Sequence, residues 1–292
     1  VAVGMCKGDP DVEKVNEILA GISEEERVSL MDQAVLDQPA DASGETADQG
    51  LIADFKKIID DYGMLFLRGA GLTLFIAILS TIIGLIIGLL VGIFRTLPLS
   101  ENPVGRFLQR IVNGLLTIYI EVFRGTPMMV QAMVIFYGTA LAFGVSMNRT
   151  LAAVLIVSIN TGAYMSEIVR GGIFAVDDGQ FEAAQAIGMT HWQTMIKVVL
   201  PQVMRNILPA TGNEIIINIK DTAVLSVISV ADLFFQGTSA AGTNFQYFQT
   251  FAIIGVIYLV LTISATQILR FVERKMDGPS AYVKLEDINP NE

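Results

Sequence analysis

Five long apolar runs divide the chain after its first sixty residues. The first, residues 69–94, holds 26 residues without a charge, and as a helix it measures about 39 Å, enough to cross a membrane with tilt. The other four runs cover residues 111–145, 151–175, 207–231 and 247–271. This pattern predicts an all-α membrane protein whose five transmembrane helices occupy residues 62–275.

Small residues recur every four positions within the first run, at Ser80, Gly84, Gly88 and Gly92. Positions with this spacing lie on one face of a helix. Small side chains on one face allow a second helix to approach closely where lipid gives no hydrophobic driving force. The stripe therefore predicts a helix-packing face.

The first 61 residues differ in composition from the rest. They contain 15 acidic and 5 basic residues, whereas residues 62–292 contain 14 of each. Residues 1–3 predict a strand, and residues 11–20 and 23–35 predict two helices, the second opened by Ser23 with Glu26 at capping-box spacing. Two interpretations stay open: an acidic amphipathic leader, or the end of a larger domain.

Residues 1–36 resemble the closing strand and helices of a periplasmic-type amino-acid-binding domain, whose sequences often end in a run like V-N-E-I-L at residues 15–19. The resemblance implies a short α/β fragment of an extracellular solute-binding domain, covalently fused upstream of the membrane part. No signal-peptide pattern follows Val1, and a fragment boundary there is favoured over an alternative start codon. Residues 37–61, rich in Ala, Asp, Ser and Gly at their start, predict a flexible linker.

Basic residues in the connections orient the spans. Residues 95–110, 170–205 and 270–284 contain ten Lys and Arg, whereas residues 146–150 and 232–246 contain one. We therefore expect a multi-pass protein of a bacterial plasma membrane with its C-terminus in the cytoplasm, including a tail over residues 276–292. The N-terminus is then extracellular.

Composition narrows the possible chemistry. Hydrophobic residues make up 52% of the chain and charged residues 16%, as in a membrane protein. One cysteine, Cys6, and one histidine, His191, exclude an internal disulfide framework and multi-histidine metal sites. We expect no catalytic residues, no metal site and no nucleic-acid partner.

A polar helical hairpin, residues 177–202, lies between the third and fourth runs. Gly188 is expected to end its first helix, Thr190 to cap the second with Gln193 in a capping box, and Pro201 to separate the hairpin from the next span. Phe181, Ala184 and Ile187 are expected to face inward. An ordinary amphipathic loop on the membrane surface is the alternative interpretation.

The hairpin resembles the EAA loop of ATP-binding-cassette importer permeases, with Val in place of the usual Ile. The resemblance implies that an ATPase docks on the matching residues, which are Glu182, Ala183, Ala184, Gly188, Val198, Leu200 and Pro201. Two further stretches resemble the polar amino-acid branch of this family, which includes glutamine, glutamate, histidine and arginine carriers. They are residues 119–127, with Arg124, Gly125, Thr126 and Pro127, and residues 167–173, with Arg170. Lys220, Asp221, Thr222 and Leu225 also fit that branch.

Ionisable side chains within the spans mark a candidate translocation path, because such groups normally face a protein interior or a wet path. On the fourth span Glu214, Asn218 and Asp221 share a face, with Lys220 about 100° away. On the third, Asn160 and Glu167 share a face. These groups could bind a zwitterionic amino acid, or they could pair with one another and fix helix register. A pair of Glu167 with Arg170 favours the second role for Glu167.

Arg124 also admits two positions. If a span begins at Gly125, the arginine anchors the cytosolic interface and residues 112–123 lie on the membrane surface. If one helix continues through, Arg124 is buried and functional. Residues 125–142 are long enough to span, which favours the interfacial position.

The family resemblance implies a transport subunit without chemistry of its own. Its expected partners are a cytosolic ATPase, a second permease copy or a sister permease, a solute-binding domain, a polar amino acid and lipid. No phosphate-binding loop occurs in the sequence, so ATP and Mg²⁺ are expected on the ATPase and no cofactor on this chain. A membrane enzyme is excluded by its missing nucleophile and metal residues. A ligand-gated channel or receptor stays open as the alternative, although it leaves the hairpin unexplained.

Overall fold

The computed structural model describes Ser23, Glu26, Ser29 and residues 44–277. The chain divides into two units, Val1–Lys56 and Lys57–Glu292, and each is described by itself. In the first unit the Glu26 amide donates to Ser23 Oγ at 3.2 Å, which is one of the two bonds of the predicted capping box. The other expectations for residues 1–36, and those for residues 278–292, lie outside the described residues.

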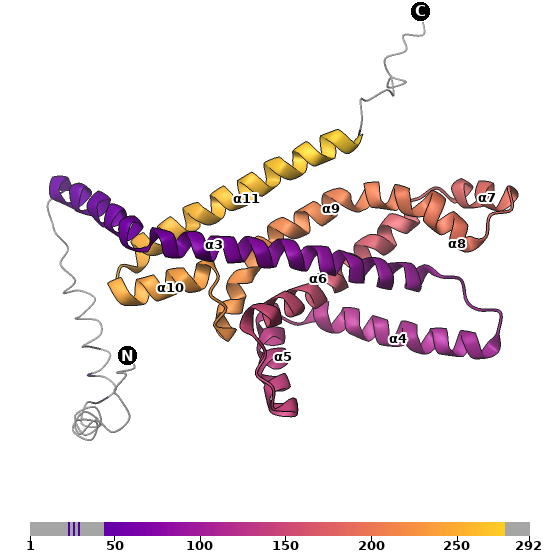
Figure 1. Ribbon diagram of the computed structural model, residues 1–292, viewed down its shortest axis with the longest axis horizontal. Helices are drawn as coiled ribbons and strands as arrows, with labels where there is room; N and C mark the ends of the chain where they lie inside the picture. Colours follow the sequence, from indigo (N-terminus) through magenta and orange to yellow (C-terminus); the bar gives the residue numbers. More distant parts are fainter. Residues whose placement is uncertain (1–22, 24–25, 27–28, 30–43, 278–292) are drawn as a thin grey trace, which may run out of the picture. The chain divides into compact units, whose positions relative to one another are not determined.

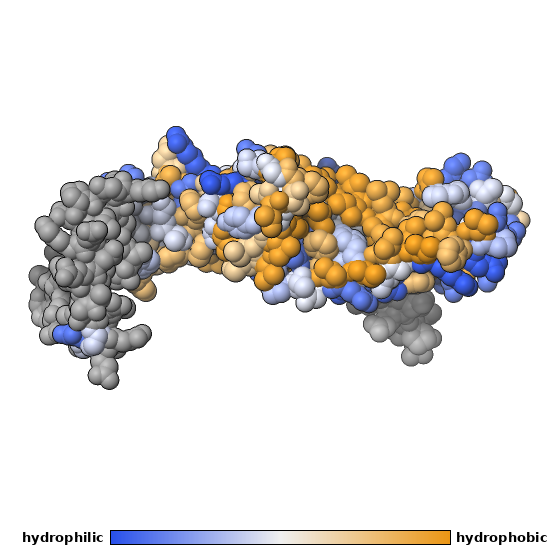
Figure 2. Space-filling view, turned by 90° about the horizontal axis from the view of Figure 1, so that it is seen from below, coloured by the Kyte–Doolittle hydropathy of each residue, from blue (hydrophilic) through white to orange (hydrophobic). Residues whose placement is uncertain are grey.

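Every element within the described residues is a helix, which confirms the all-α membrane fold (Figure 1). The elements are α3 Gly44–Thr96, α4 Pro103–Gly125, α5 Met128–Phe143, α6 Arg149–Phe174, α7 Asp178–Ala186, α8 His191–Thr194, the π-helix η1 Met195–Val199, α9 Leu200–Asp221, the 3₁₀-helix η2 Thr222–Ile228, α10 Leu233–Asn244 and α11 Tyr247–Asp277. Apolar side chains cover much of the face shown in Figure 2, as lipid contact requires.

The expected count of five spans differs from what length and apolar composition support. Among the described residues, three helical stretches are long and apolar enough to cross a membrane: Gly50–Thr96, Arg149–Phe174 and Tyr247–Lys275. The pair α4 and α5, bent by 115° at the predicted break, is a fourth candidate. Helix α9 does not qualify because the polar residues of its candidate path, with Arg205, lower its hydropathy.

Residues 44–61 are helical, which corrects the flexible linker expected there. The physical reason is visible in the second unit, where Ile58 and Phe66 of α3 are only 2% and 1% exposed. Together with Tyr62 they form one apolar face that packs in a cluster with Leu233 and Ile254 of α10 and α11. Burial of this face favours a continued helix over a flexible chain.

The predicted stripe of small residues packs against α6. Ser80 Oγ donates to the carbonyl of Val154 at 3.2 Å. Each of the three glycines has an α6 side chain where its Cβ would be: Thr161 beside Gly84, Met165 beside Gly88 and Val169 beside Gly92. The stripe thus lets the two backbones approach closely, as its spacing predicted.

Candidate functional site

The hairpin formed by α7 and α8 is capped as the sequence predicts. Gly188 ends the first helix in the left-handed region, at φ +80°, which suits glycine. The Thr190 amide donates to Gln193 Oε1 at 2.9 Å, and the Gln193 amide donates to Thr190 Oγ1 at 3.3 Å. Both bonds of the capping box are therefore present.

The hairpin buries fewer side chains than expected. Ala184 is 3% exposed and Phe181 is half-buried, but Ile187 is 78% exposed, so its expected inward position is wrong. Ile187 caps α7 after its last helical residue and therefore leaves the buried face of that helix. Glu182 and Ala183 are exposed and accessible to a partner.

Helix continues without a break from the hairpin into α9, which corrects the separation expected at Pro201. The π-helix η1 joins α8 to α9, and Pro201 follows it as the second residue of α9. Met195 and Val199 of η1 are buried against Val169 and Ile173 of α6. The hairpin is thus fixed to the membrane helices through packed side chains.

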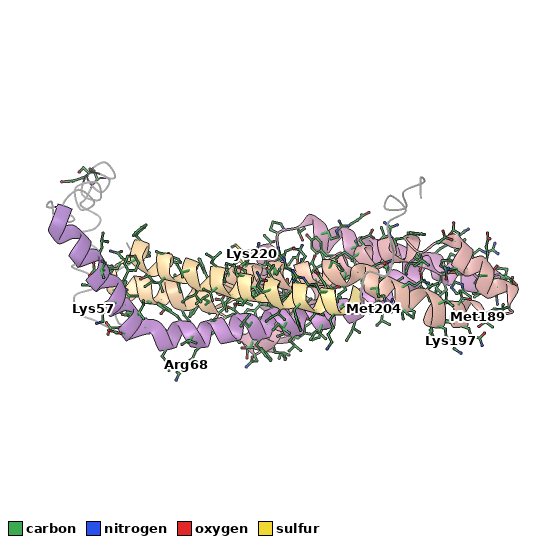
Figure 3. All side chains as sticks on the ribbon, turned by 90° about the horizontal axis from the view of Figure 1, so that it is seen from above. Lys57, Arg68, Met189, Lys197, Met204 and Lys220 are labelled. Atoms are coloured by element: carbon green, nitrogen blue, oxygen red, sulfur yellow. The ribbon has the colours of Figure 1, made fainter. Side chains whose placement is uncertain are left out.

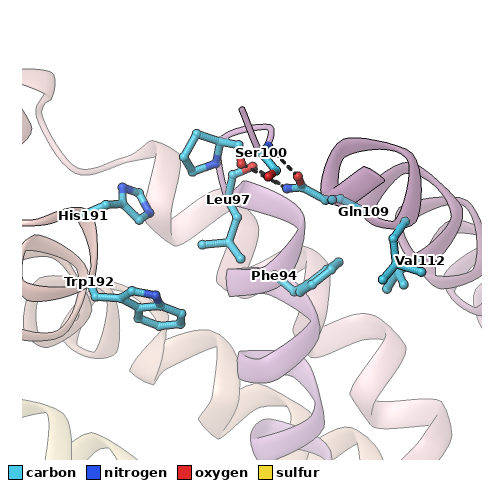
Figure 4. Close-up of a pocket in the computed structure, with 10 residues that line it drawn as sticks. Phe94, Leu97, Ser100, Gln109, Val112, His191 and Trp192 are labelled. Atoms are coloured by element: carbon cyan, nitrogen blue, oxygen red, sulfur yellow. Dashed lines mark hydrogen bonds between the residues drawn. The ribbon is translucent and has the colours of Figure 1, made fainter. Parts of the chain in front are cut away.

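The remaining motif residues lie where the hairpin joins α9. Val198 and Leu200 are half-buried, and Pro201 is exposed. The carbonyl of Val198 accepts a bond from Gln202 Nε2 at 2.9 Å. An apolar pocket of about 460 Å³ separates α8 from the corner between α3 and α4 (Figure 4). His191 and Trp192 of α8 line it together with Phe94 and Leu97, and no sequence pattern predicted this pocket.

A second pocket, of about 270 Å³, brings together most of the predicted path residues. Its walls come from α6, α9 and the break between α4 and α5. They comprise Thr126, Pro127, Met128, Asn160, Tyr164, Glu214, Ile217, Asn218 and Asp221. Glu167 and Lys220 do not line it, and Lys220 is exposed on α9 (Figure 3).

The two amides of this pocket hold the helices together. Asn218 Nδ2 donates to Thr81 Oγ1 at 2.9 Å and to Thr161 Oγ1 at 3.0 Å, joining α9 to α3 and α6. Asn160 Nδ2 donates to the carbonyl of Phe123 at 3.1 Å and to Gln131 Oε1 at 2.9 Å. Gln131, which also donates to the carbonyls of Phe123 and Thr126 at the break, is a structural contact that sequence reasoning missed.

The two carboxylates of the pocket, Glu214 and Asp221, do not join helices in this way. Among the described residues, neither Glu214 nor Asp221 forms an ion pair with a lysine or arginine. Glu214 is 9% exposed. Two carboxylates in one pocket, with amide and phenol groups beside them, suit a ligand that carries an ammonium or guanidinium group.

Arg124 lies beside this pocket and is exposed. Its guanidinium is 5.5 Å from the ring centroid of Tyr164, near the middle of α6. Residues 112–123 lie within α4, which packs on α6, where the Tyr119 hydroxyl donates to the carbonyl of Ile159 at 2.6 Å. One long helix does not continue through Arg124, since α4 ends at Gly125.

Glu167 pairs with two arginines near the hairpin end of α6. The predicted pair with Arg170 is present at 2.7 Å. The second partner, Arg95 of α3, also donates to Thr117 Oγ1 of α4 at 3.5 Å. Sequence reasoning counted Arg95 only as an orienting charge, because nothing in the sequence reveals a pairing across 72 positions.

Comparison with known proteins identifies the family of this chain. Residues 84–278 match the model of the binding-protein-dependent transport system inner membrane component, and this match includes the hairpin and both pockets. The chain belongs to this family. Among its relatives, the glutamine transport system permease protein GlnP of Escherichia coli is 40% identical over 167 residues, which is 57% of this chain and 76% of the relative.

Other relatives of this inner membrane component agree. The arginine transport system permease protein ArtQ of Bacillus subtilis is 40% identical over 158 residues, which is 54% of this chain and 72% of the relative. A crystal structure of an amino acid ABC transporter with histidines is 38% identical, covers 74% of this chain and 96% of its own, and has a TM-score of 0.64. The MetNI methionine ABC transporter, in an inward-facing conformation, shares the fold at 21% identity and a TM-score of 0.58.

Proposed function

We propose that this inner membrane component carries a polar amino acid across the membrane, and that a separate ATPase docked on the α7–α8 hairpin drives it. The observation that carries the proposal is the capped, exposed hairpin on a chain that is 40% identical to permeases named for glutamine and arginine transport. A rigid hairpin packed on α6 through η1 can pass a push from the ATPase to the membrane helices. ATP and Mg²⁺ bind the ATPase in this proposal.

The basic connections support a cytoplasmic position for the hairpin and the C-terminus. The acidic N-terminal residues then lie outside, where a solute receptor delivers its ligand. Covalent fusion to that receptor, which the resemblance of residues 1–36 suggests, would raise its effective concentration at the pathway. A second permease copy or a sister permease completes the assembly, and each permease takes one ATPase.

The 270 Å³ pocket is the proposed resting place of the amino acid in the membrane. The α-ammonium group is drawn to Glu214 and Asp221, because neither carboxylate forms an ion pair among the described residues. Arg124, over Tyr164 at the rim, is placed to attract the α-carboxylate. The amides of Asn160 and Asn218 hold together the helices that line the pocket and add polar groups to its wall.

The experiment is uptake of labelled amino acids into proteoliposomes that contain the permease, the ATPase and the receptor. We expect uptake only with ATP. In Gly188→Asp, the side chain meets a positive φ and the hairpin is distorted, so the ATPase should no longer co-purify while membrane insertion is retained. Uptake that persists without ATP would support the alternative, a ligand-gated channel.

Substitution of the pocket carboxylates tests the site separately. Glu214→Gln and Asp221→Asn keep the side-chain shape and remove the charge, and each should reduce uptake about tenfold or more while ATPase association is unchanged. Asn213→Ala is the matched control, because Asn213 is exposed on α9 and does not line the pocket. Equal losses in all three variants would argue against a charge-specific site.

A further inference from the structure

Helix α4 carries a continuous polar stripe. Its members are Arg106, Arg110, Asn113, Thr117, Glu121 and Arg124, each three or four positions from the next. This spacing places all six on one face of the helix. The stripe extends over about 27 Å, from the first turns of α4 to its last turn.

The chain's own helices cover only the middle of the stripe, where Asn113 and Thr117 are half-buried. Helix α4 packs on α6 through the Tyr119 hydroxyl, and the neighbouring Ile120 is only 5% exposed. Arg110, Glu121 and Arg124 are exposed. Asn113 Oδ1 is buried and has no hydrogen-bond partner among the described residues.

A second exposed face of α4 has the opposite character. It consists of Val104, Ile111, Leu115, Ile118 and Val122, which are 44% to 74% exposed. An apolar face of this kind suits lipid. Charged side chains on the neighbouring face would be costly in lipid, so that face must lie against water or protein.

Each end of the stripe lies next to one of the two pockets. At one end Arg124 packs over Tyr164, a wall of the 270 Å³ pocket. At the other, the first turns of α4 approach the hairpin, because Gly105 and Gln109 line the 460 Å³ pocket with Trp192. Between them, Thr117 accepts a bond from Arg95, the partner of Glu167.

We propose that the polar stripe of α4 lines the exit path along which the amino acid moves from the membrane pocket to the hairpin side. The stripe carries both signs of charge, as a zwitterion requires: Arg110 and Arg124 attract its carboxylate and Glu121 its ammonium group. The inference rests on the proposed transport function and extends it to α4. A stripe buried against a second permease subunit is the competing arrangement.

Thiol accessibility in the assembled transporter separates the two arrangements. Arg110→Cys and Glu121→Cys are made in a Cys6→Ser background, and the controls Leu115→Cys and Ile118→Cys lie on the apolar face. The complex without nucleotide, in proteoliposomes, is treated with a membrane-impermeant cationic thiol reagent from the hairpin side. Stripe positions should react about tenfold faster than the controls, because only a hydrated thiolate reacts.

Excess transported amino acid should slow labelling at Glu121→Cys, because the substrate occupies the path. No labelling of the stripe, or equal labelling of both faces, would overturn the inference in favour of a buried interface or an unstructured opening. Glu121→Gln adds a functional measurement: it should raise the KM for uptake several-fold with ATPase association intact. Absence of ATP-dependent uptake by the unsubstituted protein would instead refute the proposed function.

Discussion

Gly88 of α3 lies so close to Met165 of α6 that a Cβ atom at position 88 would stand 2.3 Å from the Cβ of Met165. The same added atom would lie 2.8 Å from the backbone carbonyl carbon of Met165. No rotation of a flexible side chain relieves such a contact, because the obstacle is backbone. The contact therefore fixes the distance between two of the membrane-spanning helices.

Gly88→Ala should destabilise the protein by about 1–3 kcal/mol, because the two helices must separate to admit one methyl group. Gly71→Ala is the matched control on the same helix, since nothing lies within 4 Å of a Cβ at that position. The control should be neutral or stabilising by up to about 1 kcal/mol, through the higher helix propensity of alanine. Thermal unfolding in detergent measures both, and equal melting temperatures would contradict the packing role.

The contact of α3 with α6 is an example of what the sequence could predict. Small residues at four-residue intervals within an apolar run have few other uses, so Gly84, Gly88 and Gly92 predicted a packing face without revealing its partner. The hairpin caps were predictable for a similar reason: Gly188, Thr190 and Gln193 act within one turn of chain, where spacing alone fixes geometry.

Contacts between distant segments were not predictable in this way. Arg95 and Glu167 each looked like an ordinary charge near a helix end, and only the fold brings them together. The contact of Arg124 with Tyr164 was unpredictable for a related reason. It depends on Asn160 and Gln131, whose bonds hold the break between α4 and α5 against α6.

Asp232, outside the membrane-spanning segments, caps α10 and should make stability depend on pH. Burial raises the pKa of Asp232 from 3.8 to about 6, although the Phe235 amide donates to Oδ1 at 2.9 Å. Because the pKa is higher in the folded state than in the unfolded state, the folded protein binds the proton more tightly. The free energy of unfolding is therefore highest, as far as Asp232 is concerned, below about pH 4. It decreases by about 3 kcal/mol as pH rises to about 6 and above.

Asp232→Asn should remove this dependence. Asparagine keeps an oxygen that can accept the Phe235 amide bond and is an equally good N-cap, but it carries no charge to bury. At pH 7.5 the variant should be the more stable protein, and near pH 4 the two should converge. Melting temperatures measured across this range provide the test, and parallel curves for the two proteins would rule out Asp232 as the titrating group.

The ion pair of Glu167 with Arg95 should contribute more to stability than the pair with Arg170. The Arg95 side chain is 20% exposed, whereas that of Arg170 is 41% exposed, so water screens the second pair more strongly. Two double-mutant cycles with Gln at all three positions should give a coupling of about 1–2 kcal/mol for the first pair and below about 1 kcal/mol for the second. A larger coupling for Arg170 would reverse the assignment.

Three apolar side chains on the hairpin should supply most of the binding energy for the ATPase. Ile187, Trp192 and Ile196 are 78%, 58% and 57% exposed, although exposed apolar groups on a polar segment are costly unless a partner covers them. Trp192→Ala should weaken ATPase binding by about 2 kcal/mol or more, a loss of about thirtyfold in affinity, with the permease still folded. Phe248→Ala is the matched control, because Phe248 is 74% exposed on α11, away from the hairpin. Binding of the purified ATPase to the permease in detergent measures both, and wild-type affinity in Trp192→Ala would exclude this tryptophan as an anchor.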